Sequence, residues 1–65
     1  MKLLNAVEKA CGELPKGYHI NLYMENGAAY IELFDYLDNE ISLCLDDLAL
    51  DEQVEEAIFA AKAGR

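Results

Sequence analysis

The stretch YHINLYMENGAAYIELFDYL, residues 18–37, decides the fold of this 65-residue chain. Apolar and polar residues alternate through it, which is typical of half-buried β-strands. Asn26-Gly27 interrupts the alternation and predicts a two-residue type I′ hairpin turn. Such a loop places three apolar pairs on one face of the hairpin: Met24 with Ala29, Leu22 with Ile31, and Ile20 with Leu33.

The opposite face of the hairpin is predicted to be aromatic. It would carry Tyr23, Tyr30, Phe34 and Tyr36, together with His19, Asn21 and Glu32. Tyr23 and Tyr30 stand directly opposite each other in this register, so their rings should touch. Tyrosine and phenylalanine often anchor interfaces, so this face is a candidate surface for a partner or a dimer; a covering helix or ring stacking within the sheet would explain it equally well.

A second hairpin is predicted at Asp38–Glu40. A three-residue loop sets Leu33 opposite Leu45 and keeps the apolar residues on one face, with a third strand at about 41–45. Either Asn39 or Glu40 should take the left-handed conformation, and asparagine adopts it more readily.

Helices are predicted on both sides of these strands. Residues 2–14 have an apolar stripe, and Pro15 prevents continuation. The second helix ends near Ala63, and its N-cap is Asp47 or Asp51. The two stripes are Leu3, Val7, Ala10, Cys11 and Leu14 in the first helix, and Val54, Ala57, Ile58 and Ala61 in the second.

The sequence therefore predicts a single α+β domain over residues 1–65, in which a three-stranded antiparallel β-meander is flanked by an N-terminal and a C-terminal helix (α-β-β-β-α). Both helices should pack on the apolar face of the sheet. The alternative, which the pattern leaves open, is that the second helix covers the aromatic face. The expected apolar face consists of Ile20, Leu22, Ile31, Leu33, Leu43 and Leu45.

Charge is distributed very unevenly along the chain. The net charge is −8, residues 1–31 sum to zero, and residues 32–65 hold the whole excess. Within them, DDLALDEQVEE (46–56) has six acids and no base. This balance argues against direct binding to nucleic acid or to an anionic membrane.

The carboxylates form a candidate partner-binding surface. Helix positions three and four apart lie about 5–6 Å from each other, and duplex DNA presents one charge per about 1.7 Å of its axis, so closely spaced acids can occupy a basic DNA-binding groove. An ordinary solvated helix face is the alternative explanation. The acids concerned are Asp35, Asp38, Glu40, Asp46, Asp47, Asp51, Glu52, Glu55 and Glu56.

Catalytic and metal sites are not expected. No calcium loop has its required glycine, and an acyl carrier would need serine where Asp47 stands. His19 has no nucleophilic partner at a defined spacing, so we expect no catalytic residue, no metal and no cofactor. Cys11 should belong to the core, Cys44 should be partly exposed, and both should be reduced in the cytoplasm.

A small, acidic, cysteine-poor chain of this kind resembles the phage-encoded anti-CRISPR proteins of type I systems, type I-C among them. The resemblance rests on the length, on DDLALDEQVEE and DYLDNE (35–40), and on the order helix, hairpin, strand, helix. It implies a non-enzymatic inhibitor, located in the cytoplasm of the host bacterial cell, that blocks target DNA recognition by acidic DNA mimicry. The implied partner is the Cas subunit that reads the PAM duplex.

The alternative function is an ordinary interaction module. In that case the protein is a small acidic homodimer, an adaptor or an antitoxin-like protein that uses its aromatic sheet face, and its acids serve solubility. The expected oligomeric state is a monomer or a weak homodimer without membrane association.

Overall fold

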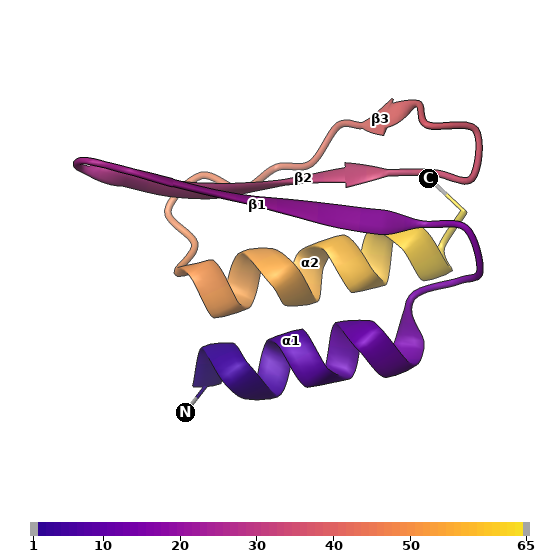
Figure 1. Cartoon of the computed structure of the whole chain (residues 1–65), viewed down its shortest axis with the longest axis horizontal. Helices are drawn as coiled ribbons and strands as arrows, with labels where there is room; N and C mark the ends of the chain where they lie inside the picture. The colour runs from indigo at the N-terminus through magenta and orange to yellow at the C-terminus, as the bar shows by residue number, and fades with distance from the viewer. Residues whose placement is uncertain (1, 65) are drawn as a thin grey trace.

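Five elements follow one another along residues 2–64, the part of the chain that the computed structural model describes. They are α1 (Lys2–Glu13), β1 (His19–Glu25), β2 (Ala28–Phe34), β3 (Glu40–Ile41) and α2 (Leu50–Lys62) (Figure 1). The α-β-β-β-α order and the antiparallel sheet β1-β2-β3 confirm the predicted α+β fold. No helix within residues 2–64 is long and apolar enough to cross a membrane.

The β1–β2 hairpin has the predicted register. Leu22 lies opposite Ile31 and Tyr23 lies opposite Tyr30. The predicted turn type is wrong, because type I′ needs a positive φ at both central residues and only Gly27 has one, at 86°. A single positive φ at the second central residue fits a type II turn instead.

The second hairpin differs from the prediction. β2 ends at Phe34, a five-residue loop follows, and β3 is only two residues long, with Leu33 opposite Ile41 rather than Leu45. Asp35 causes the difference, since its Oδ1 accepts hydrogen bonds from the backbone N–H groups of Leu37 (2.8 Å) and Asn39 (3.0 Å). The left-handed residue is Asp38, with φ 62°, rather than Asn39 or Glu40.

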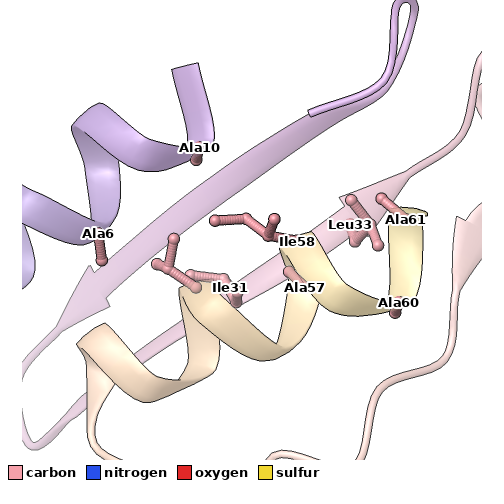
Figure 2. Packing of buried hydrophobic residues seen from close by; sticks show 9 residues of the cluster. Ala6, Ala10, Ile31, Leu33, Ala57, Ile58, Ala60 and Ala61 are labelled. Carbon is pink, nitrogen blue, oxygen red and sulfur yellow. The ribbon is translucent and has the colours of Figure 1, made fainter. Parts of the chain in front are cut away.

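The core lies between the sheet and α2. Both helices lie on the same side of the sheet, but α2 packs against β2 while α1 packs mainly against α2 (Figure 1). Ile31 and Leu33 of β2 face Ile58 and the small residues of α2 (Figure 2). The buried residues of α2 include its whole predicted stripe: Val54, Ala57, Ile58 and Ala61, with Gln53 and Ala60 in addition.

α1 is rotated slightly relative to the prediction: Ala10 of the predicted stripe is buried and Leu3 and Leu14 pack against the core, but Val7 and Cys11 do not belong to it. Its buried residues are Ala6 and Ala10, which approach α2, whereas Val7 is 39% exposed. The prediction that Cys11 belongs to the core is wrong, because this side chain is exposed. Two alanines one turn apart let the helix backbones come close, so small residues rather than the largest apolar ones form the α1–α2 contact.

The two helices run in the same direction, and ion pairs join them at two levels. Lys9 Nζ lies 3.4 Å from Glu55 Oε1, and Lys62 pairs with Glu13 near the C-terminal ends. The hydrogen bond from Lys62 lowers the pKa of the Glu13 carboxyl, although burial opposes the shift. A lowered folded-state pKa means that this stabilisation exists above the ordinary carboxyl pKa and is lost as pH falls through the folded value.

The N-cap of α2 is Ala49, so the prediction of Asp47 or Asp51 is wrong. Ala49 has no side-chain acceptor, but its N–H donates to Glu52 Oε1 at 2.9 Å. Gln53 Nε2 also donates to the carbonyl oxygen of Leu48 at 3.1 Å, which ties the preceding turn to the helix. Asp47 lies within that turn with φ 63°, so its role there is conformational.

Candidate protein-binding surfaces

Three of the predicted acids lie around the loop between β2 and β3. Asp35 accepts two backbone hydrogen bonds and Asp38 is left-handed, so both shape the loop. Glu40 begins β3 and is exposed. The carboxylate of Asp35 is half-buried and engaged within the loop, so Asp38 and Glu40 are the more available groups here.

The other six acids surround the beginning of α2. Asp46, Asp47, Glu52 and Glu55 are exposed, whereas Asp51 and Glu56 are half-buried. In Figure 1 the start of α2 and the β2–β3 loop lie at opposite ends of the long axis. The nine acids therefore form two groups rather than one continuous array.

Lysines of α1 partly balance the negative charge of the six acids around the beginning of α2. A cleft between the two helices is lined by Lys2 and Lys9 on one side and by Asp51, Glu52 and Glu55 on the other. Of the nine predicted acids, only Glu55 forms an ion pair within residues 2–64. The acidic character is therefore strongest away from this cleft, at the turn that carries Asp46 and Asp47.

The outer sheet face carries two stacked cross-strand ring pairs. The Tyr23 and Tyr30 centroids are 5.1 Å apart, which confirms the predicted contact, and those of His19 and Phe34 are 5.0 Å apart with an interplanar angle of 8°. Both helices lie on the other side of the sheet, so neither covers this face (Figure 1). His19 stands against a ring rather than beside a nucleophile.

Tyr36 does not belong to this face, which corrects the prediction. It follows the end of β2, is 67% exposed, and has its ring 6.4 Å from that of Tyr18. Its Cβ lies 2.7 Å from where a Cβ on Gly17 would stand, and Gly17 has φ 90°. Glycine therefore allows the α1–β1 connection to pass close beneath the β2–β3 loop.

We predict that the phenol of Tyr23 titrates above the ordinary pKa of tyrosine. Interaction with the Glu32 carboxylate raises the pKa of its phenol, while the Asn21 amide, 3.5 Å from the hydroxyl, acts against this shift. Because the folded-state pKa is raised, the associated stabilisation is present at neutral pH and lost as pH rises through that pKa. Ultraviolet titration of the wild type and of Glu32→Gln tests this: the variant should shift part of the tyrosinate absorbance change to lower pH, and an unchanged curve would contradict the prediction.

An apolar groove between α1 and β1 was not foreseen from the sequence. It has a volume of about 530 Å³, and its walls include Leu3, Val7 and Cys11 of α1 and Ile20 and Leu22 of β1. The stripe assigned to the core from its spacing thus partly lines an open groove. The signal that could have revealed it was Ala6, one turn before Ala10 of the predicted stripe, because the two alanines together form a face of small residues on α1.

Both thiols are free and exposed, as expected for Cys44 but not for Cys11. Within residues 2–64 no group of three or more metal-ligating side chains comes together. Comparison with known proteins found no matching family model, no matching curated protein and no matching solved structure.

Proposed function

We propose that this protein is a non-enzymatic inhibitor that binds the basic nucleic-acid-binding surface of a protein partner in the bacterial cytoplasm. Its resemblance to type I anti-CRISPR proteins suggests the PAM-reading subunit of a surveillance complex as that partner. The observation that supports the proposal is the one-sided charge. Residues 35–56 contain nine acids and no base, and only Glu55 among these acids has an ion-pair partner within residues 2–64.

Acids without a local cation remain available to an external one. Cas-type effectors hold nucleic acid in positively charged channels, which also attract an acidic protein over a distance. Binding of this kind is fast and weakens as salt is added. Asp46 and Asp47, together with exposed Glu52, would stand in for phosphates at one end of the molecule, and Asp38 and Glu40 at the other.

The first experiment is a competition assay. The protein is added to a type I surveillance complex, and binding of a PAM-containing DNA duplex is followed at low and moderate salt. We expect displacement of the DNA that weakens as salt rises. Unchanged DNA binding at every concentration would contradict the proposed target.

A double variant, with a matched control, then tests the acidic surface. Asp46→Asn with Asp47→Asn removes two charges at the turn before α2 and retains a residue type that tolerates the left-handed φ of position 47. The concentration of protein needed to displace the DNA should rise about tenfold, as expected when charge-assisted contacts are lost. Lysine at Glu52 or Glu55 would be a poorer test, since it removes the cap contact or the Lys9 pair.

The control for this double variant is a second double variant, Glu8→Gln with Glu25→Gln. Both residues are exposed and lie outside residues 35–56, and either double variant changes the net charge from −8 to −6. Inhibition by the control should stay close to that of the wild type. Equal weakening of the two double variants would show that net charge alone matters and would contradict a localised decoy surface.

The second candidate function is a homodimeric or adaptor-type interaction module. It is favoured by the stacked rings on a sheet face that neither helix covers. Under this proposal, Tyr23→Ala with Tyr30→Ala should convert a dimer to a monomer in sedimentation velocity, whereas Asp46→Asn with Asp47→Asn should leave the dimer intact. A wild-type protein that is monomeric at all concentrations would contradict the homodimer.

A further inference from the structure

β1 is an edge strand that lacks the usual protection of sheet edges. The strand order is β1-β2-β3, so one side of the seven-residue β1 faces away from the sheet. Within residues 2–64, the backbone hydrogen bonds made outside helices and strands do not involve residues 19–25. β1 also contains neither lysine nor proline, which commonly prevent pairing at an edge.

The position of α1 indicates that one more strand would fit beside β1. α2 packs against β2, and α1 packs against α2 on the β1 side, where the groove opens. Packed helices lie about 8–10 Å apart and adjacent strands about 4.8 Å apart, so one helix spacing corresponds to about two strand spacings. α1 therefore lies beneath the place of a strand just outside β1.

The groove has the character that such a strand requires. Side chains on the inner face of an added strand would enter a space walled by Val7 and Leu14 on one side and by Leu22 on the other. Val7 and Leu22 are 39% and 44% exposed, so apolar area remains to be buried there. We propose that the groove between α1 and β1 binds an extended peptide segment of a protein partner, which adds to the sheet as a strand along β1.

A second copy of this chain cannot occupy the strand position beside β1. Pairing two copies through their β1 edges would bring the α1 of each copy beneath the β1 of the other. The two α1 helices would then compete for the same layer, since each already reaches one strand position beyond its own β1. The occupant is therefore a strand that has no helix of its own on that side.

Charge at the two ends of the groove specifies the peptide further. Its cationic lining residue is Lys16, at the α1–β1 connection, and no carboxylate lines it. Glu25 ends β1 at the opposite end. The best partner is an extended segment of about seven residues in which alternate residues are apolar, with an acid near Lys16 and a base near Glu25.

The test selects peptides of about eight residues from a random display library against the wild-type protein. We expect enrichment of alternating apolar residues between an acidic and a basic end. Val7→Glu, which places a charge in the groove wall, should weaken the selected peptide at least about tenfold, whereas Leu4→Glu should not. Leu4 is the matched control because it lies on the same helix, is 53% exposed and does not line the groove.

The two thiols give a second readout that needs no variant. Cys11 lines the groove and Cys44 does not, and both are exposed. Bound peptide should slow alkylation of Cys11 by iodoacetamide and leave Cys44 unaffected.

The proposal is overturned if no peptide is enriched, if selected peptides bind Val7→Glu as well as wild type, or if Cys11 reacts at the same rate in their presence. It is also overturned if the protein alone is a dimer with a protected Cys11. None of these outcomes depends on the acidic surface, so this inference stands apart from the proposed function.

Discussion

Leu33→Ala is expected to lower the free energy of unfolding by about 2–5 kcal/mol, the largest loss among the substitutions considered. Leu33 is fully buried, and it is the largest side chain for which this is so within residues 2–64. Truncating a buried leucine to alanine costs about 2–5 kcal/mol, through lost transfer free energy and the cavity left behind. A domain of this size has a total stability of only about 3–10 kcal/mol, so the loss is a large share of the free energy of unfolding.

Urea denaturation followed by circular dichroism measures this effect. Leu37→Ala is the matched control, since the same atoms are removed from a side chain that is 64% exposed, and its unfolding free energy should stay within about 0.5 kcal/mol of wild type. A similar, small loss in both variants would show that the β2–α2 interface is not the centre of the core.

Ala57→Leu is expected to have the second largest effect. Ala57 is fully buried on α2, where small residues let the helix lie close to its neighbours (Figure 2). Three added carbons would have to fit into a fully buried site, and overpacking of this kind costs about 1–3 kcal/mol. The helix must move away from β2 or from α1, and either movement weakens further contacts.

Thermal denaturation is the measurement for Ala57→Leu. In a domain of this size each kcal/mol corresponds to a midpoint shift of about 4–8 °C, so a fall of roughly 5–20 °C is expected. Ala63→Leu, at the exposed end of α2, makes the same change outside the core and should leave the midpoint nearly unchanged. A raised midpoint for Ala57→Leu would reveal an unfilled space between the layers.

The first hairpin was predictable because its information is local. A single turn-forming pair, Asn26-Gly27, sets one register, and this register brings the apolar residues Leu22 and Ile31 opposite each other. The second hairpin was not, since Ile41, Leu43 and Leu45 also alternate and pack against the core without forming a full strand. The Asp35 carboxylate organises the loop through two short-range hydrogen bonds, and such local competition does not appear in a hydrophobic pattern.

The groove could not be foreseen because it depends on which face of α1 is used. Periodicity identified a stripe whose Ala10 is buried as predicted, yet Ala6 rather than Val7 or Cys11 joins it in the contact with α2. Whether a large or a small face meets a neighbour is decided by the space that α2 leaves, which is a property of the assembled layers. The stacked rings were foreseeable for the same reason as the hairpin, since cross-strand neighbours follow directly from register.

The contact between α1 and α2 has a consequence for the order of folding. These helices are the first and last elements of residues 2–64, yet they pack against each other, while the β1–β2 hairpin joins near neighbours in the chain. Short loops close sooner than long ones, so the hairpin can form early, whereas α1 must wait until α2 has been synthesised. During translation the nascent chain would therefore expose Leu33 and Ile31 until α2 emerges, and folding would follow as one late cooperative event.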